Sequence, residues 1–308
     1  MSEALLEHAT RSIEVGSKSF ATASKLFDPL TRRSAVMLYA WCRHCDDVVD
    51  GQTSGFGQTQ GDRADSEQRL AELFSATNSA YAGEPMSDPA FAALQEVTTV
   101  HGIPKRFPLQ HLEGFAMDVH DRRYVTLDDT LEYCYHVAGV VGVMMAMIMG
   151  TKDEATLDRA CDLGLAFQLT NIARDLVEDA EIGRCYLPSQ WLDEAGIPQD
   201  AIADRRHRAA LATLAARLVE AAEPYYASAR IGISALPVRS AWAIATARGV
   251  YREIGVKVKA RGATAWDERV STSKLDKLRL LTEAAGTALA SRGANAEPRS
   301  PGLWQRPR

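Results

Sequence analysis

The sequence predicts a single all-α domain with a ligand pocket between its helices. Almost every long stretch carries apolar residues at three- and four-residue steps, as in residues 205–222 (RRHRAALATLAARLVEAA). Helix-favouring Ala, Leu, Glu and Arg are abundant, whereas alternating β-branched runs bounded by hairpin turns are missing. A chain of 308 residues is long enough to bury a sizeable core.

Composition divides the chain into a domain, residues 1–290, and a tail, residues 291–308. The tail carries three prolines and no apolar periodicity, which predicts disorder. A second irregular stretch, Gly51 to Asp65 (GQTSGFGQTQGDRAD), is rich in Gly, Gln and Thr and predicts a mobile loop.

Several classes of protein are disfavoured by the sequence. A formal net charge of -5 argues against nucleic acid as a partner. The five cysteines are odd in number and scattered, so we expect no disulfide framework. Cys42 and Cys45 form a CxxC spacing without a second ligand pair, and we interpret them as helix cysteines. The apolar run Val137 to Gly150 has 14 residues, too short to span a bilayer, and no secretory signal is visible. We expect a monomeric cytoplasmic protein.

The first acidic cluster is Asp46-Asp47-Val48-Val49-Asp50. On a helix, Asp46 and Asp50 share a face, and Arg43 lies three residues before Asp46 on the same side. The preceding residues are apolar, which predicts a mostly buried helix. Because one arginine cannot neutralise three buried acids, we expect a metal or another cation here.

The second cluster places Asn171, Asp175 and Asp179 at four-residue steps on one helical face, beside Arg174. Hard oxygen ligands suit Mg²⁺, which binds through one or two carboxylates and substrate phosphates. Two such helices facing each other would hold magnesium ions around a diphosphate, with Arg43 and Arg174 as phosphate clamps. The alternative is that both acidic faces are merely solvated.

Two further groups of residues could serve either the site or the structure alone. The Met cluster of residues 144, 145, 147 and 149 would form either a wall of the ligand pocket, with Gly139 and Gly142 leaving room beside it, or ordinary core packing. Asp118 and Asp121 lie beside Arg122 and are interpreted as a surface ion-pair set.

Several stretches, in order and at compatible distances, are similar to the squalene/phytoene synthase family over roughly residues 10–285. They are residues 17–20 (SKSF), 42–50 (CRHCDDVVD), 133–142 (YCYHVAGVVG), 168–179 (QLTNIARDLVED) and 183–188 (GRCYLP). The long second acidic motif with its RCYLP ending is the most specific of them.

The resemblance implies an isoprenoid synthase helical bundle around a central cavity. It implies head-to-head condensation of two allylic diphosphates with Mg²⁺, or Mn²⁺ as a substitute, and without a nicotinamide cofactor. By position, Asp46 and Asp50 would hold metal from one side, and Asn171, Asp175 and Asp179 from the other. Substrate would be contacted by Ser17, Ser19, Phe20, Arg43, Tyr135, Gly139, Gln168, Arg174, Tyr186, Tyr251 and Arg269. Catalysis would rest on Asp46, Asp50, Asp175 and Tyr135.

Within the family, the motifs look most like those of bacterial phytoene synthases, which implies geranylgeranyl diphosphate as substrate and a place in carotenoid biosynthesis. The alternatives are a squalene or dehydrosqualene synthase acting on farnesyl diphosphate, a terpene cyclase or head-to-tail synthase, which fit the SKSF and RCYLP elements poorly, and a non-catalytic helical scaffold. Prenyl diphosphates are the expected partners. Peripheral contact with a membrane or with neighbouring carotenoid enzymes stays open, as does the proton-accepting base.

Overall fold

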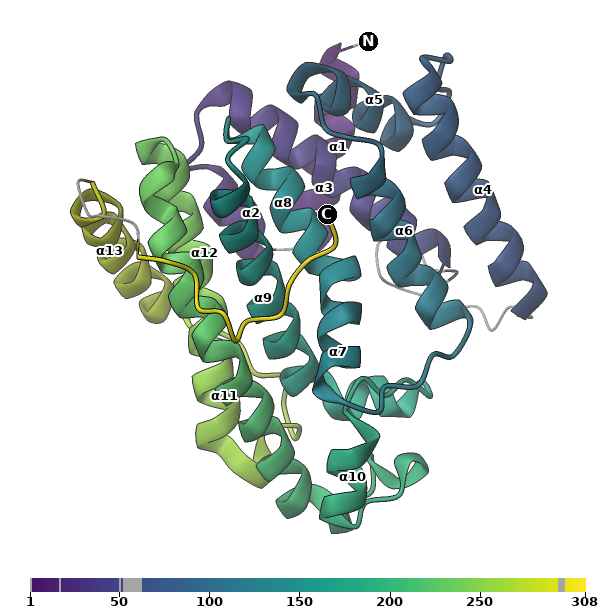
Figure 1. Ribbon diagram of the computed structural model, residues 1–308, viewed down its shortest axis with the longest axis vertical. Coiled ribbons are helices and arrows are strands. Elements are labelled where there is room, and N and C mark those ends of the chain that lie inside the picture. The colour runs from purple at the N-terminus through teal and green to yellow at the C-terminus, as the bar shows by residue number, and fades with distance from the viewer. Residues whose placement is uncertain (1, 17, 50, 52–62, 293–296) are drawn as a thin grey trace.

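The computed structural model describes residues 2–16, 18–49, 51, 63–292 and 297–308 (Figure 1). Regular structure within these ranges is entirely helical, which confirms the predicted fold class. The α-helices are α1 (Ser2–Gly16), α2 (Lys18–Ser24), α3 (Pro29–Val49), α4 (Arg63–Ala82), α5 (Pro89–His101), α6 (Arg106–Val119), α7 (Leu127–Cys134), α8 (Val140–Ile148), α9 (Glu154–Glu181), α10 (Ser189–Ala195), α11 (Arg208–Gly232), α12 (Val238–Arg261) and α13 (Lys274–Ala290). Short elements are η1 (Tyr135–Gly139), η2 (Gln199–Ala201), η3 (Arg205–His207), η4 (Ile233–Ala235) and η5 (Gly262–Thr264). Residues 52–62 of the predicted mobile loop lie outside the described ranges.

Helix α9 runs through the middle of the bundle (Figure 1). It begins where the Asp153 carboxylate accepts a hydrogen bond from the Thr156 backbone N–H at 2.9 Å, an N-cap. It packs against α8, η1, α11 and α12, and more than half of its 28 residues are buried. Several charged residues of this helix, Arg159 and Asp162 among them, therefore lie in the core.

Helices α7 and α8 form one continuous helix through η1, a π-helical turn at Tyr135–Gly139. Thr126 and Asp129 form a capping box that starts it. The whole segment, Leu127–Ile148, is long and apolar enough to cross a membrane, longer than the apolar run seen in the sequence. However, 67% of its most apolar window is buried inside the protein, which is typical of a core helix.

Small residues bring the π-turn and α8 into backbone contact with α9. A Cβ atom added at Gly164 would lie 2.4 Å from the carbonyl oxygen of Ala138, and one at Gly142 would lie 2.4 Å from that of Ala160. Real Cβ atoms do not approach backbone so closely, so both positions require glycine. The two helices therefore touch through main chain.

His111 of α6 is buried between aromatic rings. Its ring centroid lies 5.5 Å from that of Trp41 and 4.9 Å from that of Phe115. Its Nδ1–H donates to the His136 carbonyl oxygen at 3.0 Å. Burial lowers the pKa of His111 to about 4, so the imidazole is neutral in the folded protein.

The chain from residue 297 to residue 308 lies along α9, where the sequence led us to expect a disordered tail (Figure 1). Its arginines meet acids on the outer face of α9: Arg299 pairs with Asp162 at 2.7 Å, and Arg306 pairs with Asp158 at 2.7 Å. Composition alone could not reveal these partners, because they lie more than a hundred residues away.

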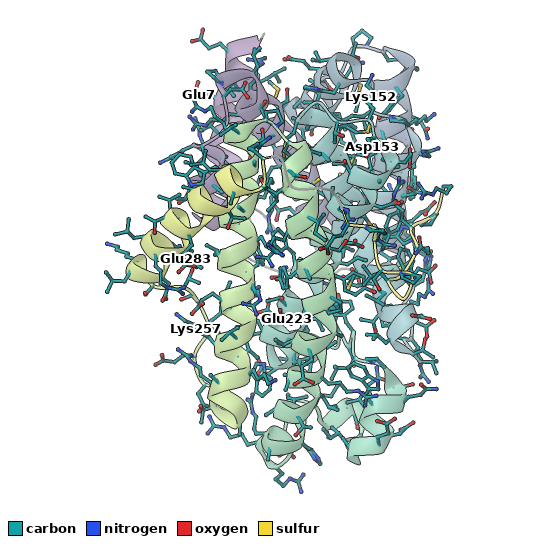
Figure 2. All side chains as sticks on the ribbon, turned by 60° about the vertical axis from the view of Figure 1, so that its left-hand side comes forward. Glu7, Lys152, Asp153, Glu223, Lys257 and Glu283 are labelled. Atoms are coloured by element: carbon teal, nitrogen blue, oxygen red, sulfur yellow. The ribbon has the colours of Figure 1, made fainter. Side chains whose placement is uncertain are left out.

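The outside of the bundle carries the charged side chains expected of a solvated surface. Figure 2 shows exposed Glu7, Lys152 and Glu283 at the edges of the molecule, pointing away from the helices. Polar groups that point inward are therefore the informative ones.

Replacing Gly164 by alanine is expected to lower the free energy of unfolding by about 1–3 kcal/mol, because the new methyl group would press on the Ala138 carbonyl. Gly286→Ala is the matched control. Gly286 lies in α13 with nothing within 4 Å of an added Cβ, so alanine should be neutral or stabilise by about 1 kcal/mol. Urea denaturation measures both, and equal effects would contradict the backbone contact.

His111→Gln is expected to make stability less dependent on pH. The folded-state pKa of about 4 lies below the usual 6.5, so the folded state binds fewer protons between these values. The stability present above pH 6.5 is therefore lost as the pH falls towards 4, by up to about 3 kcal/mol. Denaturation at both pH values should show a smaller loss in the variant. The exposed His8→Gln control should match the wild type, and a variant that also matches it would contradict this account.

Candidate active site

A cavity of about 1170 Å³ lies between the helices that surround α9. Its lining comes from α2, α3, α6, the continuous α7–α8 helix, α9, α11, α12 and α13. Charged and polar side chains line one end, which we call the mouth. The rest of the lining is mostly apolar. A cavity with these two regions is suited to a ligand with a charged head and a long hydrocarbon chain.

The mouth brings the two predicted acidic helices together. Asp46 of α3 and Asn171 of α9 both line it, as do the predicted Gln168, Arg43 and Arg174. Further polar residues at this cavity are Asp118, Arg184, Arg269 and Lys277. Asp50 and Ser17 fall outside the described residues, and so do the side chains of Ser19 and Phe20.

On α3, Arg43 holds two carboxylates. Its Nη1 donates to Asp46 at 2.7 Å, and its Nη2 donates to Asp47 at 2.6 Å. Helical spacing of three and four residues produces this fork. The guanidinium is thus fixed at the mouth, where it could meet an incoming anion.

On α9, Asp175 is the centre of a second group of ion pairs. It accepts hydrogen bonds from Arg174 Nε at 2.8 Å and from Arg269 Nη2 at 3.1 Å. Arg269 also bonds to Glu178. Arg269 comes from the segment between η5 and α13, so this later part of the chain reaches the acids of α9.

Asp179 is a shielded acid one helical turn after Asp175 on α9. Burial, together with nearby Asp175, raises its pKa to about 7, with Arg184 acting in the opposite direction. A shielded carboxyl with too little positive charge nearby binds a proton more readily, and it would equally be stabilised by a cation. Its environment therefore fits a divalent metal.

Asp118 is a site residue whose role the sequence did not reveal. It lines the cavity. It accepts hydrogen bonds from the hydroxyl of Tyr133 at 3.2 Å and from that of Tyr186 at 3.0 Å. The sequence did contain a signal for this position, because Asp118 follows His111 and Phe115 at helical spacing on α6, and both of these residues are buried.

The structure does not place Tyr135 where the family resemblance implied a tyrosine that contacts substrate. Tyr135 is fully buried, does not line the cavity, and donates a hydrogen bond to Gln110 at 2.7 Å. Tyr133 lines the cavity instead. Residues two apart on a helix point to nearly opposite sides, so only one of the two can face the ligand.

Two other predicted substrate contacts lie behind the lining. Gly139 faces α9, where an added Cβ would meet the Cys161 sulfur at 3.0 Å. Tyr186 is buried and stacks on Tyr133, with ring centroids 4.4 Å apart. It contacts the lining residues Tyr133 and Asp118 from behind.

Aromatic faces line the cavity near the mouth. The predicted Tyr251 is among them and stacks on Phe167, with ring centroids 4.1 Å apart. Phe167, which sequence reasoning missed, directly precedes Gln168 in the second motif. Tyr39 of α3 adds a third ring, and burial raises its pKa to about 12. These rings give the zone beside the charges an electron-rich wall.

The apolar part of the cavity uses half of the methionine cluster. Met145 and Met149 line it, four residues apart on the helix, whereas Met144 and Met147 pack elsewhere in the core. Gly142 lines it as well. Part of this segment therefore lines the cavity and part packs in the core, and its use as a wall for an isoprenoid chain stays a prediction.

The cysteines behave as predicted. All five are free, and Cys42 and Cys45 lie within α3. Burial raises the pKa of the Cys45 thiol well above its usual value, so it is inert as a nucleophile at neutral pH.

In the described ranges, no three His, Cys, Asp or Glu side chains converge closely enough to hold a metal by themselves. The acids at the mouth are instead divided between two helices and paired with arginines. This arrangement fits a metal that completes its ligand shell with phosphate oxygens and water, as Mg²⁺ commonly does.

The chain is similar to characterised enzymes over nearly its whole length. It is 60% identical over 303 residues to phytoene synthase of Pseudescherichia vulneris, and 61% identical over 303 residues to 15-cis-phytoene synthase of Pantoea ananas. Each alignment covers 98% of both chains.

Solved structures share the fold. A ligand complex of a dehydrosqualene synthase superposes with a TM-score of 0.82 at 26% identity, covering 94% of this chain and 98% of that one. A squalene synthase from Alicyclobacillus acidocaldarius gives a TM-score of 0.74 at 25% identity, covering 85% and 95%. The family model for squalene/phytoene synthase matches residues 13–276. With its helical bundle, charged cavity mouth and motif order, this chain belongs to the squalene/phytoene synthase family.

Proposed function

We propose that the chain is a phytoene synthase, which condenses two molecules of geranylgeranyl diphosphate head to head to give phytoene and releases diphosphate. The observation that carries this proposal is a single cavity with charged groups at one end and a long apolar remainder. It is supported by the identity of 60% to a phytoene synthase along almost the entire chain.

The length of the cavity suits a long prenyl chain. One stripe of α9 lines it from Thr156 to Arg174, and at 1.5 Å per residue this stripe spans about 27 Å. Cavity-lining residues between these ends include Ala160, Leu163 and Phe167. A diphosphate at the Arg174 end would leave its hydrocarbon chain in apolar surroundings.

The arginines of the mouth would bind the diphosphates. Arg43, Arg174 and Arg269 present planar donor forks, which match phosphate oxygens well. Each now bonds to carboxylates. Magnesium ions held by those carboxylates and by Asn171 would neutralise the leaving diphosphate, and Mn²⁺ would serve as a substitute. The arginines could then turn their free donors to the phosphates.

The apolar and aromatic residues would protect the carbocations. Loss of diphosphate from one substrate gives an allylic cation, which the alkene of the second attacks. Proton loss yields a cyclopropylcarbinyl diphosphate, which ionises, rearranges and loses a proton to give phytoene. The faces of Tyr39, Phe167 and Tyr251 stabilise positive charge without acting as nucleophiles, and the apolar walls exclude water.

We assign to Tyr133 the part that the motif suggested for Tyr135. The Tyr133 hydroxyl is held by Asp118, and burial raises its pKa well above the usual value. It is therefore a neutral, oriented phenol beside the mouth. Released diphosphate is the better candidate for the proton acceptor, because the Tyr133 phenol stays protonated and donates a hydrogen bond to Asp118.

A squalene or dehydrosqualene synthase acting on farnesyl diphosphate is the alternative. It is favoured by the solved dehydrosqualene synthase with a TM-score of 0.82, but that chain is only 26% identical. We also propose that the enzyme acts as a cytoplasmic monomer. Most of its most apolar helix is buried inside the protein, which supports a core helix in place of a membrane span.

The purified protein, incubated with Mg²⁺ and geranylgeranyl diphosphate, is expected to form phytoene without a reductant. Chelation of the metal should stop the reaction, and added Mg²⁺ should restore it. The same assay with farnesyl diphosphate, with and without NADPH, checks the alternative. A product from farnesyl diphosphate in either condition, with none from geranylgeranyl diphosphate, would contradict the proposal.

Asp175→Asn is expected to lower turnover by about a hundredfold or more, because a carboxylate that would hold metal beside the cavity loses its charge while its shape is kept. Asp193→Asn, an exposed acid on α10, is the matched control and should retain wild-type activity. Steady-state kinetics and circular dichroism separate lost chemistry from lost fold. A folded and fully active Asp175→Asn would remove this residue from the metal site.

Tyr133→Phe is expected to reduce kcat by about tenfold or more, since an oriented hydroxyl at the mouth is lost. Tyr135→Phe loses only a hydrogen bond to Gln110 behind the cavity, so its main effect should be on thermal stability. The opposite ranking of the two kcat values would restore the assignment that the motif first suggested.

A further inference from the structure

Arg159 is a buried cation at the apolar end of the cavity. Only 6% of the residue is exposed, yet it lines the cavity with Met149, Thr156, Ile233 and Leu236. These neighbours come from the end of α8, the start of α9, η4 and the residue that follows η4. All lie at the end away from the mouth, and we call this group, with Arg159, the floor.

The two halves of the Arg159 side chain do different things. Its stem packs on α11, where a Cβ added at Gly232 would lie 2.8 Å from Arg159 Cβ and 3.2 Å from its Cδ. Its guanidinium donates to the carbonyl and hydroxyl oxygens of Ser228 at 3.1 and 3.3 Å, and to the carbonyl oxygen of Glu297. The aliphatic stem of Arg159 therefore forms part of the cavity wall, while its guanidinium is hydrogen-bonded to α11 and to the end of the chain.

The same chain end keeps a nearby acid occupied. Asp162 is fully buried one helical turn after Arg159 on α9. It accepts two hydrogen bonds from Arg299 at 2.7 and 2.9 Å and one from the Ser228 hydroxyl at 2.5 Å. Arg299 therefore neutralises the buried Asp162 carboxylate, and the Arg159 guanidinium bonds to Ser228 and Glu297 instead.

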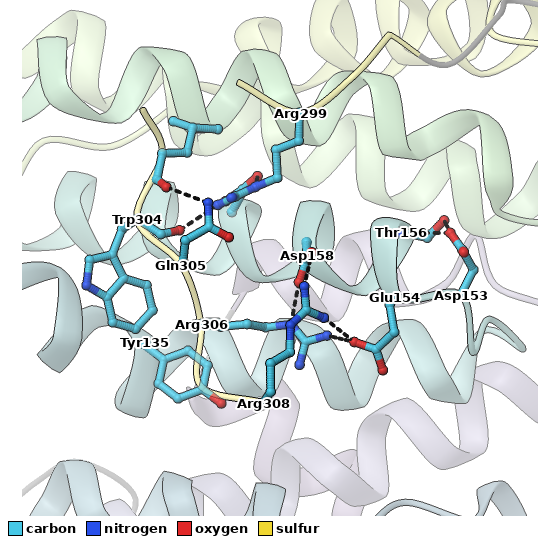
Figure 3. A network of polar contacts seen from close by, with 12 residues as sticks. Tyr135, Asp153, Glu154, Thr156, Asp158, Arg299, Trp304, Gln305, Arg306 and Arg308 are labelled. Carbon is cyan, nitrogen blue, oxygen red and sulfur yellow. Dashed lines mark hydrogen bonds and ion pairs between the residues drawn. The ribbon is translucent and has the colours of Figure 1, made fainter. Parts of the chain in front are cut away.

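Residues 297–308, here called the C-terminal strap, are fixed at several points (Figure 3). Arg306 pairs with Asp158 at 2.7 Å. The Trp304 ring lies 5.4 Å from that of Tyr135, and its backbone N–H donates to the Tyr225 hydroxyl at 3.2 Å. The strap thus ties α9, η1 and α11 together behind the floor.

From these contacts we propose that Arg159, fastened by the C-terminal strap, closes the floor of the cavity and sets the longest prenyl chain that the enzyme accepts. The proposal deepens the function proposed above and rests on it. The diphosphate reacts at the mouth, so the floor meets only the last isoprene unit of a long chain. A change at the floor should therefore alter selection by chain length and leave the chemistry intact.

Arg159→Ala tests the proposal directly. Alanine removes about as many heavy atoms as one isoprene unit adds, which opens the floor. We expect turnover of geranylfarnesyl diphosphate to rise by about tenfold or more over the wild type, with farnesyl diphosphate turnover changed by no more than about twofold. The assay offers farnesyl, geranylgeranyl and geranylfarnesyl diphosphates separately with Mg²⁺ and reports kcat and KM for each.

Arg306→Gln is the matched control, because it removes an ion pair at the other end of the strap while Ser228 and the Glu297 carbonyl still hold Arg159. It should lower the melting temperature while keeping the wild-type order of substrates. An equal shift in Arg306→Gln would mean that general loosening is responsible, which would overturn the assignment of Arg159. An unchanged order of substrates in a folded Arg159→Ala would overturn it as well.

Gly232→Ala tests the floor from the other side and covers the case in which Arg159→Ala fails to fold. The added methyl group meets the Arg159 stem and fills the floor. The ratio of kcat/KM for geranylgeranyl over farnesyl diphosphate should fall by about tenfold, and an unchanged ratio would contradict the proposal. A wild-type protein inactive on geranylgeranyl diphosphate would instead refute the proposed function, whatever the variants do.

Discussion

The compensation of charge along α9 is the constraint on which the rest of the molecule depends. This central helix carries Arg159, Asp162, Arg174 and Asp175 in surroundings where an unpaired charge is costly. At the mouth the partners are arginines, which bond to carboxylates on α3 and α9. At the far end the partners belong to the strap, whose arginines pair with Asp158 and Asp162. One helix thus carries one group of charges at the cavity mouth and another that holds the end of the chain.

The sequence predicted well whatever depends on spacing along a single helix. Helical periodicity indicated the all-α class, and four-residue steps put Asp46 and Asn171 on faces that the structure brings to one cavity. The Arg43 fork with Asp46 followed from the same geometry. These features are local, so they could be worked out before any fold was known.

Features that depend on contacts between distant segments were missed. The choice between Tyr133 and Tyr135 depends on how their helix is rotated against its neighbours, and a π-turn begins at Tyr135 itself. Asp118 looked like a surface acid because its two tyrosine partners lie on other segments. The tail looked disordered because its arginines find their acids only after α9 is in place. In each case the deciding partner lies too far along the chain for periodicity to reveal it.

The backbone contact between α9 and the η1–α8 segment limits where substitutions can change the substrate range of the enzyme. Ala138, Gly142, Ala160 and Gly164 all line the cavity, and two of them sit against opposing carbonyl groups. Along the strip formed by these four residues, the ligand would contact backbone peptide groups, because only small side chains cover them. A larger residue there would push the helices apart before it could reshape the tunnel. New substrate ranges should therefore arise from substitutions on the facing helices and at the two ends, while this strip stays unaltered.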